Sequence, residues 1–440
     1  MVELARAAPL RNTAPALLDF SHFPLHRATL PNGLRVVVHV DRRLPLVADN
    51  LWYHVGSKNE RPGRTGFAHL FEHMLFQGSA HVDTNGHFRH LQGVGGVANG
   101  STWYDRTNYY ETVPANCLDL ALWLESDRMG FLLEALDQRK LDNQRDVVLN
   151  ERRQTVDNRP YGRPYERLFE LLVPPDHPYN WPVIGRAEDV AAATLDDVRE
   201  FFRTWYRPAN AVLTLAGDLE PEAAVAAVEK WFGDLPKAPL PARPARPLPP
   251  LAEPIRETVT DEVRLPRIYA AFRTPRFGAA EWDAGALLAA LLADGRTSRL
   301  YRDLVWERQL AQEAGAFLYP TEELGVFVAF ATARPGVEPA RLAAELRKHL
   351  DAAASSADEL DLQRARNRTL RGVWEALETL DERADRLSMH ATFFDRPEGA
   401  WEEAGRYAAL SAGELAEFAG SYLGAERGVE LTVLPRSEAP

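Results

Sequence analysis

The sequence predicts an α+β fold built as two similar units, each a mixed β-sheet with helices packed on one face. Two observations support this prediction. A proline-rich segment divides the 440 residues into parts of similar length, and both parts show the same order of apolar patterns. In each part, strand-like segments come first, helix-like segments follow, and one more strand closes the unit. Strands followed by helices that pack on a sheet face are typical of an α+β unit.

The first part begins and ends with strand patterns. Alternating apolar residues predict its strands, and apolar residues three and four positions apart predict its helices. We expect strands at 34–40 and 46–55, a helix at 66–77, a hairpin at 97–104 and 108–113, helices at 116–135, 141–156 and 195–205, and a closing strand at 211–216.

The second part repeats this order. We expect a strand at 267–273, a helix at 281–293, a short helix at 298–308, strands at 313–319 and 325–333, helices at 338–354, 359–390 and 412–422, and a closing strand at 429–434. The helix at 281–293 corresponds to the helix at 66–77, but its segment 286–292 has no group that can bind a metal. We therefore expect the second unit to be a wall, a substrate platform or a docking surface.

The boundary between the parts is the proline-rich segment 236–254, which has eight prolines among nineteen residues. Proline fixes φ and lacks a backbone N–H, so this segment cannot form a helix or an inner strand and favours an extended spacer. We therefore expect a first, catalytic domain at 1–235, a linker at 236–255 and a second domain at 256–440.

Composition and charge are ordinary for a globular protein and argue against some partners. Hydrophobic residues make up 45% of the chain and charged residues 26%. The formal net charge of −12 argues against nucleic acid and anionic membranes, which require a basic surface. No apolar run approaches the roughly 20 residues of a membrane span. The first ten residues lack the apolar core of a signal peptide, so we expect a cytoplasmic protein, or a periplasmic one if a leader has been removed.

The most informative motif is His69-Leu-Phe-Glu72-His73. Residues three and four apart are neighbours on a helix, so these three polar side chains share one face. Two neutral imidazoles at this spacing can hold one zinc ion, and the Glu before the second His can take a proton from an attacking water. The alternative is that these residues occur together by chance on a solvated helix face.

A zinc hydrolase also needs a third protein ligand and an open position for water. The segment 141–154 reads as a helix, and one stripe of it is formed by Gln144, Val148, Glu151 and Thr155. Glu151 could therefore point, together with Gln144, toward a common centre. Taken alone, a Glu in a charged helix is usually a solvated surface residue.

In this order along the chain, the motifs resemble the insulinase/pitrilysin metallopeptidases, or inverzincins, and in particular the catalytic subunit of bacterial relatives of the mitochondrial processing peptidase. The matching segments are 31–36, 55–57 with Glu60, 66–78, 95–102 with 107–109, and 145–151. The resemblance covers nearly the whole chain. It implies the duplicated fold of that family and one zinc ion held by His69, His73 and Glu151.

The resemblance also implies roles for neighbouring residues. Glu72, which is not a ligand, is expected to act as general base and acid in peptide hydrolysis. The first strand of the hairpin is expected to have an open edge that pairs with a substrate peptide, with Asn99, Gly100 and Thr102 as candidate contacts. The alternative is an ordinary hairpin with polar residues facing water. The family often carries a second Glu seven residues before the ligand Glu, where this chain has Gln144, so the surroundings of the site are altered.

Other histidines and loops near the motif are expected to be structural. We expect His81, His87 and His90 to be surface or packing residues, because the zinc ligands are already supplied. The segments 161–165 and 177–182 are also similar to segments of the family, and we interpret them as packed loops.

A catalytic pair of the family is missing from this chain. Active members resemble one another in an Arg and a Tyr, seven positions apart, on the helix that follows a Ser-Arg-Leu segment. Here the aligned positions on the predicted helix are Val305 and Gln312, which cannot replace that pair. Arg302 or Arg308 could stand in. We expect instead a homologous subunit that lacks the zinc motif and carries the Arg and the Tyr.

The function expected from the resemblance is a zinc metalloendopeptidase, the catalytic subunit of a heterodimer, acting on peptides or unfolded segments. If the units enclose a chamber, compact folded proteins should not enter it. One alternative is a noncatalytic structural subunit of a larger complex, which predicts a degraded motif. Another is a metal-storage or carrier protein, which has no need of Glu72.

Overall fold

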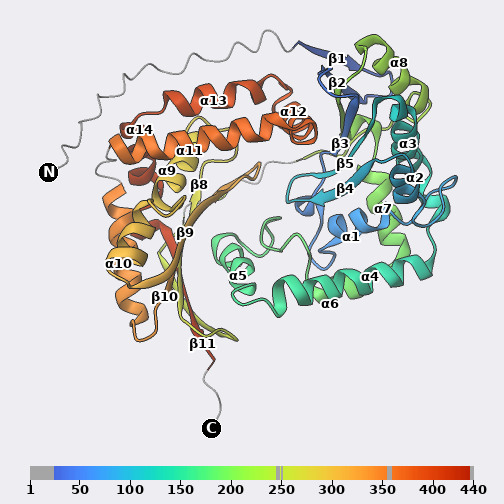
Figure 1. Ribbon diagram of the computed structural model, residues 1–440. Coiled ribbons are helices and arrows are strands. Elements are labelled where there is room, and N and C mark those ends of the chain that lie inside the picture. The colour runs from blue at the N-terminus through green and yellow to red at the C-terminus, as the bar shows by residue number, and fades with distance from the viewer. Residues whose placement is uncertain (1–23, 244–247, 249–250, 354–358, 437–440) are drawn as a thin grey trace, which may run out of the picture.

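The computed structural model describes residues 24–243, 248, 251–353 and 359–436, and Figure 1 shows two α+β units in them. Two expectations concern segments that are not fully described. The N-terminal residues that lack a leader pattern lie outside the described residues, as do 244–247 and 249–250 of the proline-rich segment.

The first sheet has six strands in the order β1-β2-β6-β3-β5-β4. They are β1 (Leu25–Thr29), β2 (Arg35–Val40), β3 (Leu46–Tyr53), β4 (Val97–Thr102), β5 (Thr107–Pro114) and β6 (Ala211–Gly217). Strands β2 and β6 pair in parallel, and the other pairs are antiparallel. Strand β4 is an edge strand, because only β5 pairs with it among the described strands.

The second sheet has five strands in the order β7-β11-β8-β10-β9. They are β7 (Ile255–Asp261), β8 (Arg267–Thr274), β9 (Ala311–Tyr319), β10 (Gly325–Ala333) and β11 (Gly428–Pro435). Strands β7 and β11 pair in parallel, as β2 and β6 do, and the rest are antiparallel. The order matches β2-β6-β3-β5-β4 strand for strand, which confirms the predicted duplication of a mixed sheet.

The helices of the first unit begin and end where local sequence signals place them. They are α1 (Phe67–Met74), α2 (Gly86–Gly93), α3 (Leu118–Ala135), α4 (Gln138–Arg152), α5 (Arg163–Leu172), α6 (Ala187–Ala191), α7 (Leu195–Trp205) and α8 (Pro221–Phe232). Helix α7 is an example. Its first turn is capped by Thr194 and Asp197, whose side chains each accept the backbone N–H of the other. Its buried face is formed by Val198, Phe201, Phe202 and Trp205.

The second unit differs from its prediction in one long helix. Its helices are α9 (Trp282–Ala293), α10 (Pro339–Ala353), α11 (Glu359–Glu378), α12 (Leu380–Phe394), α13 (Gly399–Ala409) and α14 (Ala412–Tyr422), with a π-helical turn at Tyr301–Glu307. The single helix predicted at 359–390 is wrong, because the chain breaks at Thr379 in extended conformation. In the described ranges, no helix is both long and apolar enough to cross a membrane.

Each sheet is covered on its second face by a helix of the other unit (Figure 1). Alternating residues of β10 show this. Phe327 and Ala329 pack with the second unit's own helices, whereas Val326 and Val328 belong to a cluster that includes Leu168 of α5. Helix α12 makes the reciprocal contact with the first sheet, where the clusters are formed by Val37, Val212 and Ala391 and by Ala48, Ala216 and Ala384. This exchange of helices fixes the two units against each other.

Candidate active site

Helix α1 presents its histidines and Glu72 away from the core. Its apolar residues Phe67, Ala68, Leu70, Phe71 and Met74 are buried, whereas His69, Glu72 and His73 are partly exposed. The helix begins after Gly66, which has a φ of 84° that favours glycine. The buried carboxylate of Glu60 accepts the backbone N–H groups of Gly66 and Ala68 at 2.9 and 2.8 Å. Glu60 thereby caps the first turn of the helix.

Helix α4 brings the carboxylate of Glu151 close to the two histidines. The distance from Nε2 of His69 to Oε1 of Glu151 is 3.7 Å, and from Nε2 of His73 to Oε2 of Glu151 it is 3.3 Å. One donor atom of each residue lies within 4.8 Å of the others. Ligands at zinc distances in a tetrahedral site are about 3.4 Å apart. The donor set and its spacing therefore fit a zinc ion.

The electrostatics of this cluster also favour the forms that bind a metal. Burial, followed by the neighbouring His73, lowers the pKa of His69 to about 4, so its imidazole is neutral at pH 7. The hydrogen bond with His73 is the largest cause that lowers the pKa of Glu151, so its carboxylate is ionised. Metals bind neutral imidazole and ionised carboxylate.

Glu72 lies next to the cluster and under the edge strand β4. The hydroxyl of Thr102 donates a hydrogen bond to Oε2 of Glu72 at 2.6 Å. Burial raises the pKa of Glu72, and the hydrogen bond from Thr102 and the charge of Arg106 oppose this rise. A Cβ atom at Gly100 would lie 3.2 Å from Cγ of Glu72, so this position leaves little room for a side chain. Two of the candidate substrate contacts therefore touch the candidate base.

The third candidate contact, Asn99, lies on the open edge of the same strand. It is exposed, its side-chain oxygen accepts the backbone N–H of Gly100 at 2.9 Å, and its side chain bonds with Tyr110. The edge of β4 that faces away from β5 has no partner strand in the described part of the chain. Contact of Asn99, Gly100 and Thr102 with a substrate stays a prediction.

Comparison with known proteins identifies the family. Residues 35–172 match the family model described as Insulinase (Peptidase family M16), and residues 192–369 match the one described as Peptidase M16 inactive domain. The zinc protease PqqE of Helicobacter pylori is 32% identical over 335 residues, which cover 74% of each chain. The chain belongs to the insulinase family, peptidase family M16.

Solved structures of M16 proteins have the same fold. A protease from Helicobacter pylori superimposes with a TM-score of 0.88 at 26% identity, over 94% of this chain and 100% of that chain. The peptidase M16 inactive domain from Pseudomonas fluorescens superimposes with a TM-score of 0.83 over 95% of this chain and 99% of that chain. At 17% identity, this second likeness concerns the fold alone.

The position for which the resemblance implies a second Glu is occupied by Gln144, which is buried on α4. Gln144 and Val148 are on the buried side of that helix, as the predicted stripe requires. The predicted helix at 141–156 continues past Arg152 as a π-helical turn at Arg153–Asp157. Position 144 thus adds no charge beside the ligand Glu151.

The three other histidines have partners away from the candidate zinc cluster. Nδ1 of His81 lies 2.5 Å from a carboxylate oxygen of Asp127, and the ring of His90 packs edge-on against Trp123. His87 is fully buried in a second group of acidic residues, with Glu111 and Glu125. The sequence pattern does not predict this buried cluster. Its one local signal is Glu125 and Arg128 at i and i+3 within an apolar helix.

The positions aligned with the family's Arg and Tyr do not share a helix. Val305 is buried in the π-helical turn, whereas Gln312 is exposed on strand β9, so the predicted continuous helix is wrong. Gln309, with a φ of 53°, turns the chain between them. Arg308 pairs with Asp303 and Glu345, and Arg302 lies 3.8 Å from Asp361. Both arginines are therefore held within their own unit.

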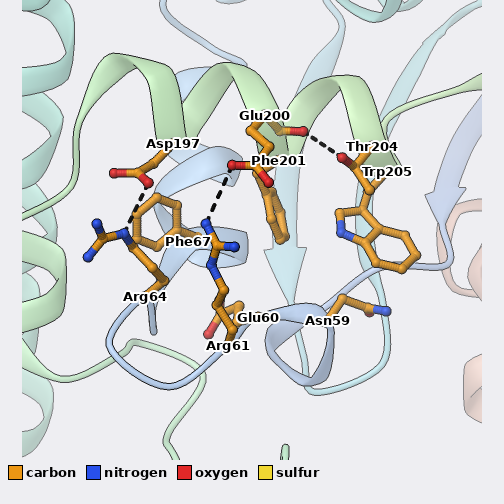
Figure 2. A pocket seen from close by; sticks show the side chains of 10 residues that line it. All are labelled: Asn59, Glu60, Arg61, Arg64, Phe67, Asp197, Glu200, Phe201, Thr204 and Trp205. Carbon is orange, nitrogen blue, oxygen red and sulfur yellow. Dashed lines mark hydrogen bonds and ion pairs between the residues drawn. The ribbon is translucent and has the colours of Figure 1, made fainter. Parts of the chain in front are cut away.

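A small cavity beside the start of α1 is separate from the cluster. It has a volume of about 150 Å³, and Figure 2 shows Arg61 and Arg64 reaching toward Glu200 and Asp197 of α7. Arg64 bonds to Asp197 at 3.0 Å, and Arg61 lies 3.4 Å from Glu200. These ion pairs tie the α1 entry loop to α7. They support the helix start and contribute nothing to the donor set of His69, His73 and Glu151.

Proposed function

We propose that this chain is a zinc-dependent metalloendopeptidase that hydrolyses peptides or unfolded segments. The observation that carries the proposal is the convergence of His69, His73 and Glu151, with Glu72 beside them. The name of the Helicobacter pylori relative, a zinc protease, agrees with it.

The three ligands would hold one Zn²⁺ with a net positive charge, since a metal binds imidazole in its neutral form and carboxylate in its ionised form. A bound Zn²⁺ supplies Lewis-acid chemistry, which lowers the pKa of water and polarises a carbonyl group. The open side of the cluster, where the Glu151 side chain is 38% exposed, is where water and substrate would enter.

Proton transfer and substrate binding would be carried out by side chains and main chain of the protein itself. Glu72 would take a proton from the attacking water and pass it to the leaving amine. Thr102 would hold one carboxylate oxygen of Glu72, which leaves the other oxygen free for proton transfer. The open edge of β4 would bind the substrate main chain as an added strand, which gives affinity with little demand on sequence.

We further propose that the chain is the catalytic subunit of a heterodimer with a homologous subunit. This is supported by Val305 and Gln312, which occupy the positions of the family's Arg and Tyr, and by Arg302 and Arg308, which face acidic partners in their own unit. The noncatalytic alternative is supported by the match of residues 192–369, the end of the first unit and much of the second, to an inactive-domain model. The first unit, in contrast, carries all the residues that the proposed activity needs, namely His69, Glu72, His73 and Glu151.

The Glu72→Gln variant tests the proposed peptidase activity. It should retain one zinc ion per chain and lose at least about 100-fold of its turnover of a quenched fluorescent peptide, the range of general acid–base catalysis. The exposed Glu222→Gln variant is the matched control. Each chain is assayed alone and with a zinc-motif-lacking homologue from the same genome. Turnover retained by Glu72→Gln would refute the role of Glu72, and full activity without the homologue would refute the heterodimer.

A further inference from the structure

A large cavity lies between the two units, next to the candidate active site. Its volume is about 590 Å³, and its wall combines loops of the first unit with strands of the second. Seven aromatic side chains line it: Trp103, Tyr104, Tyr161, Tyr165, Phe169, Tyr319 and Phe330. A cavity of this size exceeds any single side chain, and pockets lined by aromatic residues are typical of ligand sites.

The cavity is connected to the candidate active site along two elements. Trp103 directly follows Thr102, which bonds to Glu72. Thr155 also lines the cavity and is one helical turn beyond Glu151, whose carbonyl accepts its hydroxyl at 2.9 Å. A peptide paired with β4 advances about 3.3 Å per residue. Its side chains would therefore reach the cavity within about two or three residues of the scissile bond.

The aromatic part of the wall is held in place by contacts between its own rings. The rings of Trp103 and Tyr319 stack with centroids 5.9 Å apart, and the ring of Phe169 meets Tyr319 edge-on at 5.1 Å. A rigid aromatic wall loses little side-chain freedom when it binds another ring. Such a wall favours a large aromatic side chain of the substrate.

The charge of the cavity opposes a basic side chain. Aromatic rings attract cations, and two of the lining rings already face one: the Arg267 guanidinium lies 3.8 Å from the Tyr161 ring centroid and 4.8 Å from that of Phe330. Arg267 pairs with Glu313, and Glu166 pairs with Arg152, so these charges cancel. Arg159 also lines the cavity and forms no ion pair with the described residues. A net positive charge therefore remains beside the rings.

The backbone of this wall has an unusual conformation. Tyr161 has a φ of 58°, which is rare for a residue other than glycine. The turn that leads to it, Arg153–Asp157, is π-helical. Left-handed residues and π-turns cluster at functional sites, where surrounding contacts stabilise them. The segment 161–165, interpreted from the sequence as a packed loop, is therefore better described as a wall of this cavity.

We propose that this cavity is a substrate side-chain subsite that accepts an aromatic residue and rejects a basic one. The inference rests on the proposed peptidase function and specifies its substrate: peptides with a Phe, Tyr or Trp within two or three residues of the cleaved bond, and without Lys or Arg at that position.

The test has a binding arm that does not depend on catalysis. Peptides that differ only in Phe, Ala or Lys at each position around the cleaved bond are measured by fluorescence anisotropy with the zinc-loaded Glu72→Gln chain and its partner subunit. At one position, Phe should bind about 10-fold or more tightly than Ala, as burial of an aromatic ring predicts, and Lys more weakly than Ala. Equal binding of all three at every position would overturn the subsite.

Two variants assign the preference to this cavity. Tyr319→Leu should remove most of the preference for Phe and leave the Ala peptide unchanged. Arg159→Glu should make Lys bind better than Ala, whereas Arg139→Glu, an equal charge change at an exposed position on α4, should not. A preference that neither cavity variant changes would overturn the assignment. Selective binding without hydrolysis by the wild-type complex would refute the proposed function and not the subsite.

Discussion

Two clusters of histidine and carboxylate groups lie in the first unit. The exposed cluster is His69, His73 and Glu151, and the buried cluster is His87, Glu111 and Glu125. In the exposed cluster, the Nε2 to carboxylate oxygen distances are 3.3 and 3.7 Å. In the buried cluster, Nε2 of His87 and Oε1 of Glu111 are only 2.5 Å apart, and both side chains are almost inaccessible to solvent.

The difference shows that ligand chemistry alone does not define a metal site. A separation of 2.5 Å is a hydrogen bond, with no room for a metal between the two atoms. The buried cluster also contains its own cation, since Nε of Arg128 donates to Oε2 of Glu125 at 2.8 Å. Spacing, access to solvent and the absence of a competing cation distinguish the exposed cluster. We therefore interpret the buried cluster as a network held together by protons and one guanidinium.

Burial favours the protonated form of these carboxyl groups. Burial raises the pKa of Glu111 and of Glu125 to about 7, and it lowers the pKa of His87 to about 3. Asp49, directly opposite Glu111 in the sheet, is also fully buried and its pKa is raised well above its usual value. Neither carboxylate oxygen of Asp49 has a hydrogen-bond partner among the described residues.

The largest expected effect follows from removal of the buried cation. Arg128→Ala should lower the free energy of unfolding by about 3–5 kcal/mol, because it leaves buried carboxyl groups without their partner. Chemical denaturation measures this. Arg139→Ala, on the solvent side of α4, is the control and should change stability little. A loss below about 1 kcal/mol for Arg128→Ala would contradict a network that depends on the guanidinium.

The pH dependence of stability is the next effect. The folded pKa of Glu111 is raised from 4.5 to about 7, so its stabilising contribution is complete below pH 4.5 and is lost as pH rises through 7. Glu111→Gln does not titrate. The free energy of unfolding of the wild type should therefore fall relative to this variant between pH 5 and pH 8.

Urea unfolding at pH 5, 6.5 and 8 measures that difference. His87 acts in the opposite direction, because its folded pKa of about 3 is below the ordinary 6.5, and its contribution is lost as pH falls. It is present in both proteins and largely cancels in the comparison. A difference between wild type and Glu111→Gln that does not change with pH would show that Glu111 is ionised in the folded state throughout.

The exposed cluster should respond in catalysis more than in stability. Thr102→Val removes the hydrogen bond to Glu72, and we expect kcat to fall by about 10- to 100-fold, the value of a hydrogen bond to a charged group. KM should change little, and Thr102→Ser should restore kcat. If KM rises and kcat is unchanged, Thr102 contacts substrate and does not position the base.

The smallest effect is expected at Gln144. Gln144→Glu adds a negative charge on the same helix as the candidate ligand Glu151 and should tighten zinc binding by up to about 10-fold, because groups that surround metal ligands tune the affinity. Competition with a metal chelator measures the affinity. Weaker zinc binding in this variant would show that the buried position cannot accommodate the charge.

The exposed cluster was predictable in part from the helical period, and the buried cluster was not. His69 and His73 are on one helix, so the period alone places them on one face, whereas Glu151 lies on another helix and was expected from the family resemblance. His87, Glu111 and Glu125 come from α2, β5 and α3, and no local period relates them. Only the sheet and the helices that pack on it bring them together.

Tertiary packing also explains the break between α11 and α12, which the sequence pattern does not predict. The segment 359–390 is free of proline, and its pattern predicts one helix. Tertiary contacts override this local pattern. Helix α12 packs against the first sheet, where Asp385 accepts hydrogen bonds from Trp52 and Asn108 at 2.8 and 3.0 Å. Strand β7 was missed because it follows the prolines directly and has exposed residues at every second position.

Zinc content of a matched pair of variants tests the central claim most directly. The wild type, His73→Asn and His87→Asn are purified, their folding is checked by circular dichroism, and zinc per chain is measured by mass spectrometry. The exposed cluster predicts one zinc ion in the wild type and in His87→Asn, and none in His73→Asn. Zinc retained in His73→Asn, or a zinc ion lost from His87→Asn, would contradict it.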